Sequence, residues 1–173
     1  TYRGYVWTKT DPNRTGIPKF LTEKTLSFEE YVDYALQVPV YSIIRNNNYH
    51  NCTKYTFQDL LDGKNNQFAP DDILIEDWIN HISTIFTEVR LKTFIEMRGA
   101  DAGSYDTLCA LPAFWSGILY QEDSLEETFK LISEFKYEDL IKFRSDVLSN
   151  GLNSIYKNKT GWEFAEKLLN ISL

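Results

Sequence analysis

The run Val89–Arg98 constrains the fold more than any other segment, because polar and apolar side chains alternate along it. This alternation predicts a β-strand with two different faces. One face is apolar and suited to packing on helices, with Val89, Leu91, Thr93, Ile95 and Met97. The other face carries three cations, one carboxylate and one ring, at Arg90, Lys92, Phe94, Glu96 and Arg98. Unpaired charges are too costly to bury dry, so this second face must be wet or paired.

Two further strands are expected nearer the N-terminus. Tyr2–Trp7 and Val40–Arg45 are rich in aromatic and β-branched residues, which favour strands. Asn46–Asn48 predicts a tight turn after the second strand, and the turn formers of Thr10–Pro18 predict a loop. Helices do not alternate with strands in regular βαβ order, so a largely antiparallel sheet is expected.

Helices are indicated by capping boxes, in which a Ser or Thr is followed three residues later by an acidic residue. These signals begin at Ser27, Thr56, Ser124 and Thr160. Asp71–Phe86 also has an apolar stripe at helical spacing, formed by Ile75, Trp78, Ile79 and Ile82. Gly151 is expected to end a helix, and Tyr105–Leu173 has no convincing strand pattern.

The sequence therefore predicts an α+β fold, with antiparallel strands and helices followed by an all-helical C-terminal segment. We expect residues 1–104 to be the sheet-bearing part of one domain and residues 105–173 to be a helical segment of the same domain. A length of 173 residues fits one domain or a large piece of one. The chain opens inside a strand-like run and closes just after a helical pattern, so we expect a fragment.

Charge and composition exclude several classes of function. The net charge of -7 and the lack of clustered Lys and Arg argue against a nucleic-acid partner and an anionic membrane surface. The longest apolar run, Leu108–Tyr120, is too short to span a bilayer. Two cysteines are too few for a disulfide scaffold, which favours a cytoplasmic location, and Cys109 is expected to be a buried thiol.

The charged face of Val89–Arg98 offers the most specific chemistry. Glu96 and Arg98 are two residues apart on a strand, which places their side chains on one face roughly 7 Å from each other. A carboxylate that ligates Mg²⁺ beside a guanidinium that binds phosphoryl oxygens would suit a metal-bound phosphate. A solvated outer face with cross-strand ion pairs explains the same pattern.

Two other residues have a functional interpretation. Arg3 lies among aromatic residues, where a guanidinium is suited to bidentate binding of a substrate carboxylate, although a stacked surface arginine fits equally. Tyr41 is either part of a substrate pocket or a core tyrosine. The sequence contains no phosphate-binding loop and no nucleophile–histidine arrangement.

Several blocks, in order, resemble glutamate–cysteine ligases of the plant and alphaproteobacterial type. The most distinctive are EVRLKTFIEMRGADAG at Glu88–Gly103 and LCALPAFWSGILY at Leu108–Tyr120. YRGYVWTKTDPNRTG at Tyr2–Gly16 and FEEYVDYALQVPVY at Phe28–Tyr41 also match the family pattern. The resemblance implies a glutamine-synthetase-like fold that binds ATP, Mg²⁺, L-glutamate and L-cysteine. The implied reaction is ligation through a γ-glutamyl phosphate, the first step of glutathione biosynthesis.

The resemblance also implies roles for particular residues. Arg3 matches the arginine that holds the glutamate carboxylate, and Tyr41 matches a tyrosine of the cysteine pocket. Glu96 matches a Mg²⁺ ligand. Arg98 matches the catalytic arginine, which binds the ATP-derived phosphate and stabilises the transition state. Supporting roles are expected for Trp7, Arg14 and Asp101.

The family's other metal-binding carboxylates are expected upstream of this chain, so the isolated fragment is expected to be inactive. Two alternatives remain open. The protein is a γ-glutamyl ligase with a different amine acceptor, or the chain is a folded piece without catalytic function of its own.

Overall fold

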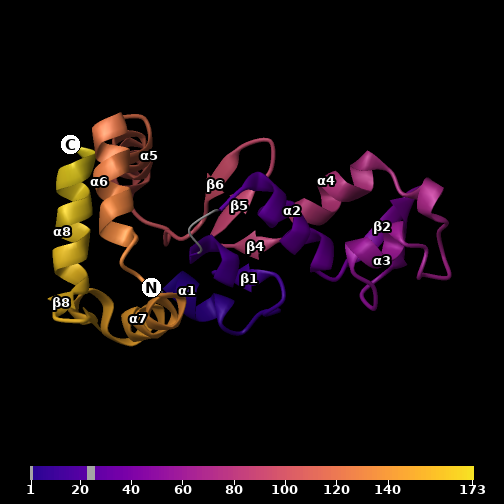
Figure 1. The fold of residues 1–173 in the computed structure, drawn as a ribbon, viewed down its shortest axis with the longest axis horizontal. Coiled ribbons are helices and arrows are strands. Elements are labelled where there is room, and N and C mark those ends of the chain that lie inside the picture. The colour runs from indigo at the N-terminus through magenta and orange to yellow at the C-terminus, as the bar shows by residue number, and fades with distance from the viewer. Residues whose placement is uncertain (1, 23–25) are drawn as a thin grey trace. The chain divides into compact units, whose positions relative to one another are not determined.

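The computed structural model describes residues 2–22 and 26–173, and its chain divides into two compact units. The strand-bearing unit is Trp7–Gly99, and the helical unit is Thr1–Val6 together with Ala100–Leu173. Figure 1 shows helices and short strands along the chain. The predicted α+β class is therefore confirmed.

Short strands and short helices make up the strand-bearing unit. Its strands are β1 (Thr15–Gly16), β2 (Ser42–Arg45), β3 (Asn48–Asn51), β4 (Phe86–Thr87), β5 (Val89–Leu91) and β6 (Ile95–Met97). Its helices are α2 (Phe28–Gln37), α3 (Phe57–Leu61) and α4 (Ile75–Ser83), with 3₁₀ turns η1 (Lys19–Thr22) and η2 (Pro70–Asp72). β2 pairs with β3 and β5 with β6 as antiparallel hairpins, whereas β1 and β4 pair in parallel. Among the described residues the strands thus form separate pairs, not the one sheet that the sequence predicted.

Several local sequence signals are confirmed. Ser27, Thr56 and Thr160 each cap a helix, and each caps it through the predicted reciprocal bonds with the acidic residue three positions later. Asn46 and Asn47 have φ angles of 50° and 62°, the left-handed conformation that asparagine tolerates better than most residues. They form the tight turn between β2 and β3.

The core of the strand-bearing unit lies between α2, α3, α4 and the β2–β3 hairpin. It consists of two clusters of buried side chains: Val40, Ile43, Cys52, Phe57 and Leu60, and Ala35, Val38 and Ile85. Trp78 packs against both clusters, and Ile82 against the second. The other two members of the predicted stripe, Ile75 and Ile79, are 65% and 50% exposed. Helix α4 is also shorter than predicted, since the Asp77 carboxylate accepts the Leu74 N–H and fixes its start.

The predicted strand at Tyr2–Trp7 is wrong, because these residues form helix α1. Asp101 explains the difference: its Oδ1 accepts the backbone N–H of Arg3 at 2.7 Å. The first N–H groups of a helix have no partner within the helix, and a carboxylate placed there stabilises it. A contact between residues far apart in sequence therefore overrides the local strand propensity.

The predicted single strand Val89–Arg98 is also wrong, because it folds back on itself as the β5–β6 hairpin (Figure 1). The bend follows Leu91, where the backbone N–H of Lys92 donates to the carbonyl of Phe94 at 2.9 Å. Antiparallel pairing satisfies backbone groups that a lone strand would leave open. Arg90 lies directly opposite Glu96 in the register, so the expectation that these two share a face survives the correction.

The helical unit begins with helix α1 (Tyr2–Trp7), whose last residue, Trp7, belongs to the other unit. Its other helices are α5 (Tyr105–Leu119), α6 (Glu122–Ile132), α7 (Tyr137–Asn150) and α8 (Gly161–Ser172), with the 3₁₀ turn η3 (Gly151–Asn153). Helices α5, α6 and α8 pack against one another. Gly151 ends α7 with a φ of 56°, as predicted. The unit is not all helical, because β7 (Ile155–Tyr156) and β8 (Lys159–Thr160) form a short antiparallel hairpin. This hairpin places Tyr156 in a 4.2 Å ring stack with Phe135.

Two other predictions fail in the helical unit. Ser124 does not cap a helix, because α6 has already begun at Glu122, and its hydroxyl instead donates to the Ile171 carbonyl at 3.0 Å. Cys109 is exposed, not buried, because α5 buries only Ile118.

In the part of the chain that the structure describes, no helix combines the length and apolar character needed to cross a membrane.

His81 should make the stability of the protein depend on pH. It is 3% exposed, and its Nε2 lies 2.8 Å from the Ala35 carbonyl, to which it donates. Burial lowers its pKa below the ordinary 6.5, so the unfolded chain binds a proton that the folded chain does not. Stability is therefore expected to fall as pH drops from about 7.5 through about 6.5.

Thermal unfolding at several pH values checks this prediction. The variant His81→Gln should flatten the dependence in this window, whereas His50→Gln, which removes the other histidine, should retain it. An equal slope in the wild type and His81→Gln would contradict the assignment.

Candidate functional site

Three charged side chains of the strand-bearing unit meet on one face of the β5–β6 hairpin. Arg90 comes from β5, Glu96 from β6, and Arg98 follows β6 directly. Arg90 and Glu96 are cross-strand partners, whose Cβ atoms in an antiparallel pair are about 5 Å apart. We call these three residues the hairpin triad.

The hairpin triad is connected by short, charged hydrogen bonds. Arg90 Nε donates to Glu96 Oε2 at 2.8 Å, and its Nη2 lies 2.7 Å from the same oxygen. Arg98 Nη1 donates to the other oxygen, Oε1, at 3.0 Å. The carboxylate is therefore bound by one guanidinium on each oxygen, an arrangement that fixes its plane.

Arg90 is also bound on its far side. Its Nη1 donates to the backbone carbonyls of Ser83, at 2.7 Å, and Ile85, at 3.1 Å. These carbonyls lie at and just after the end of α4, where helix carbonyls lack partners within the helix. Arg90 is only 8% exposed and belongs to the interior of the unit.

The electrostatics of Glu96 reflect these neighbours. Burial by itself raises the pKa of Glu96, but the hydrogen bond and positive charge of Arg90, with the charge of Arg98, outweigh burial and hold the pKa below its ordinary value. Glu96 is thus an anion at neutral pH. Two guanidiniums and one carboxylate leave the hairpin triad with one net positive charge, which suits an anionic ligand.

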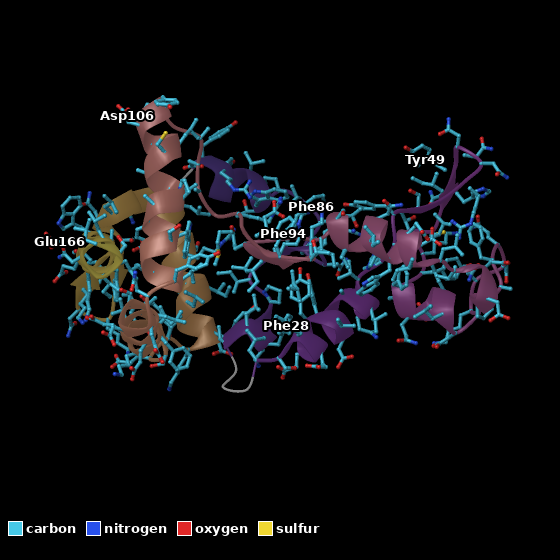
Figure 2. All side chains as sticks on the ribbon, turned by 90° about the horizontal axis from the view of Figure 1, so that it is seen from above. Phe28, Tyr49, Phe86, Phe94, Asp106 and Glu166 are labelled. Carbon is cyan, nitrogen blue, oxygen red and sulfur yellow. The ribbon has the colours of Figure 1, made fainter. Side chains whose placement is uncertain are left out.

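Phe86 of β4 lies beside both arginines and is labelled in Figure 2. Its ring centroid is 5.6 Å from the Arg98 guanidinium carbon and 6.0 Å from that of Arg90. The Trp7 ring packs against Phe86 with centroids 5.5 Å apart. These rings favour the cations by cation–π attraction and restrict their side-chain rotation.

The described residues do not by themselves fit a magnesium site. Among them, no three His, Cys, Asp or Glu side chains gather closely enough to hold a metal ion. Glu96 is flanked by two guanidiniums, which repel a divalent cation. Mg²⁺ at this carboxylate would need its other ligands from outside these residues, and the role of Glu96 as a metal ligand stays a prediction.

Tyr41 lies in the same unit but in different surroundings. Tyr41 is 41% exposed, and its ring faces the guanidinium of Arg14, whose carbon is 3.6 Å from the ring centroid. Arg14 is 1% exposed and donates to Asp11, to the Thr84 hydroxyl at 2.9 Å and to the Pro39 carbonyl at 2.5 Å. The hydrogen bond from Arg14 lowers the pKa of Asp11. Arg14 therefore fixes the backbone that leads to Tyr41, a role that its place in a turn-rich loop did not indicate.

Arg3 belongs to the helical unit, on α1, with its backbone bound to Asp101. The structure thus brings Glu96 and Arg98 together, places Tyr41 elsewhere in their unit, and puts Arg3 in the other unit. The alternation along Val89–Arg98 placed Arg90 on the charged face but indicated no role for it. Its position opposite Glu96 on the neighbouring strand indicates a role, but that position is known only once Val89–Arg98 is known to form a hairpin.

Comparison with known proteins gives the family. Residues 1–150 match the family model described as glutamate-cysteine ligase family 2 (GCS2). The chain belongs to this family. The resemblance noted in the sequence is therefore confirmed.

Three relatives of this family illustrate the match. Glutamate–cysteine ligase A, chloroplastic, of Oryza sativa subsp. indica is 44% identical over 171 residues, covering 98% of this chain and 35% of that protein. The chloroplastic ligase of Nicotiana tabacum is 44% identical over 90% of this chain and 30% of its own length. The chloroplastic ligase of Arabidopsis thaliana is 42% identical over 98% of this chain and 33% of its own. The chain thus spans about a third of the length of these relatives.

The names of these relatives correct the predicted location. Each is a chloroplastic protein, which contradicts the expectation of a cytoplasmic one. The expectation rested on a low cysteine count, and a low cysteine count does not distinguish one reducing compartment from another.

Glu96→Gln should destabilise the protein, because it leaves the nearly buried Arg90 without its counter-charge. The expected loss is about 1–3 kcal/mol in the free energy of unfolding, the range for an orphaned buried polar partner. Denaturant unfolding of the full-length protein measures it. Glu166→Gln, which removes an exposed carboxylate on α8 (Figure 2), should change stability by less than about 0.5 kcal/mol. Equal losses in both variants would contradict the structural role of Glu96.

Proposed function

We propose that the full-length protein ligates the γ-carboxylate of L-glutamate to the amine of L-cysteine, using ATP and Mg²⁺, in the first step of glutathione biosynthesis. The family match over residues 1–150 carries this proposal. The net positive hairpin triad supports it, because the reaction passes through phosphorylated, strongly anionic species. The names of the relatives support a plastid as the location.

The proposed reaction has two steps. A γ-carboxylate oxygen of glutamate attacks the terminal phosphorus of ATP, forming an acyl phosphate as ADP leaves. The cysteine amine then attacks the acyl carbon, and inorganic phosphate leaves as the amide bond forms and the nitrogen loses a proton. Neither step needs a covalent bond to the enzyme, so the protein contributes positioning and charge stabilisation.

Arg98 is the residue proposed to act on the transferred phosphoryl group. Its guanidinium is oriented by Glu96 at 3.0 Å and faces Phe86, which limits its freedom before the substrate arrives. A preoriented cation loses little conformational freedom when negative charge develops on the phosphoryl oxygens. When bound, Mg²⁺ would neutralise further phosphate charge, and Glu96 is the described residue proposed to contribute to it.

Two residues are proposed to bind the amino-acid substrates. Arg3 would hold the glutamate carboxylate through its guanidinium. Tyr41 would line the cysteine pocket, where the contact with Arg14 holds its ring in place. We further propose that residues 1–104 and 105–173 belong to one catalytic domain with a glutamine-synthetase-like fold, completed by the rest of the protein.

Replacing Arg98 tests the proposed function. In the full-length enzyme, Arg98→Ala should lower kcat for γ-glutamylcysteine formation about 10²–10³-fold, the loss typical of removing one charge-stabilising donor. The matched variant Lys92→Ala removes a cation from the bend of the same hairpin and should retain activity within about twofold. The assay is product identification by mass spectrometry, with phosphate release measured in parallel.

Three outcomes would contradict parts of the proposal. Normal turnover of Arg98→Ala would exclude the role given to Arg98. A wild-type product that contains another amine in place of cysteine would identify a different γ-glutamyl ligase. Clear turnover by the 173-residue chain alone would show that the residues outside it are not essential.

A further inference from the structure

Arg90 has more fixed contacts than an ion pair with Glu96 requires. One end of its guanidinium is bound to the Glu96 carboxylate, and Nη1 is bound to the backbone carbonyls of Ser83 and Ile85. The carbonyls belong to the last residue of α4 and to the residue just before β4, so they hold the guanidinium against the junction of these two elements. Arg90 thereby fixes the carboxylate of Glu96 relative to that backbone.

Glu96 passes this position on to Arg98. Its Oε2 is bound to Arg90 and its Oε1 to Arg98 Nη1, so the carboxylate links the two guanidiniums and holds Arg98 at one of its nitrogens. Without Arg90, the Glu96 side chain could rotate about its own bonds and take Arg98 with it. Both arginine side chains are largely buried, with exposed fractions of 10% for Arg90 and 15% for Arg98, so the surrounding atoms leave them little room to change rotamer.

We propose that Arg90 is a positioning residue of the ligase, which holds Arg98 in its catalytic orientation through the carboxylate of Glu96. This inference rests on the proposed function of Arg98. Arg90 itself is given no contact with substrate, because it is 8% exposed and each of its three side-chain nitrogens already contacts Glu96 or a backbone carbonyl. Its effect on Arg98 is transmitted through Glu96.

Arginine is required at position 90 by this geometry. Its planar fork reaches the carboxylate with Nε and Nη2 and the carbonyls with Nη1 at the same time. A lysine ammonium at this place is a single point charge and cannot span both sets of acceptors. The variant Arg90→Lys therefore retains the charge and loses the positioning.

Steady-state kinetics of the full-length enzyme tests the proposal with Arg90→Lys, Arg90→Gln and the matched control Lys92→Gln. Misplacing a catalytic group by about 1 Å costs roughly 10²-fold in rate. Both Arg90 variants should therefore lower kcat by about 10–100-fold while the KM values for glutamate and cysteine stay within about threefold. Lys92→Gln should behave as the wild type, because Lys92 lies in the bend of the hairpin, 5.9 Å from the Phe94 ring.

A double variant asks whether Arg90 acts through Arg98. If it does, Arg90→Lys combined with Arg98→Ala should be no slower than Arg98→Ala alone, because the group being positioned is already gone. Multiplied losses in the double variant would overturn the proposal. Thermal unfolding shows whether each variant is folded. If Arg90→Gln does not fold, the kinetic comparison uses Arg90→Lys alone.

The outcomes separate this inference from the proposed function. An active wild type in which folded Arg90→Lys retains normal kcat overturns the positioning role and leaves the ligase assignment intact. An unchanged kcat with raised KM values also overturns it, since that would indicate a role in substrate binding. A wild type and a Lys92→Gln variant that both form no γ-glutamyl product overturn the proposed function itself.

Discussion

The carboxylate of Glu96, bound between two guanidiniums, is the interaction on which the geometry of the charged hairpin depends. Arg90 takes one oxygen at 2.8 Å and Arg98 the other at 3.0 Å. The same carboxylate therefore stabilises a nearly buried cation and orients a more accessible one. Charged hydrogen bonds are stronger than neutral ones, so together with the Phe86 ring they hold this face of the hairpin in one arrangement.

The surrounding backbone is held in place by arginines in two separate locations. Arg14 links a turn-rich loop to Thr84 and to the Pro39 carbonyl, and Arg90 binds the carbonyls of Ser83 and Ile85. Both arginines are almost fully buried, and both have partners on the backbone around the end of α4. The end of this helix thus connects the neighbourhood of Tyr41 with the hairpin triad, within one compact unit.

Features encoded by neighbouring residues were predictable from the sequence. The capping boxes at Ser27 and Thr160 and the Asn46–Asn48 turn depend on side chains that reach two or three positions along the chain. Features set by distant residues were not: Tyr2–Trp7 became a helix through Asp101, and a single predicted strand became the β5–β6 hairpin. At the site, the placement of Glu96 and Arg98 on one face was predicted from their spacing, whereas their direct hydrogen bond and the anchoring of Arg90 at the end of α4 were not.

The central claim is that Glu96 holds Arg98 in position for the phosphoryl group while remaining bound to Arg90. A crystal structure of the full-length enzyme with ATP, Mg²⁺ and a phosphorylated inhibitor that mimics the acyl phosphate tests it most directly. The claim predicts an Arg98 nitrogen within about 3.2 Å of a phosphoryl oxygen, with Glu96 still bonded to both arginines. A structure in which Glu96 has turned away from both arginines, or Arg98 does not reach the phosphoryl group, would contradict it.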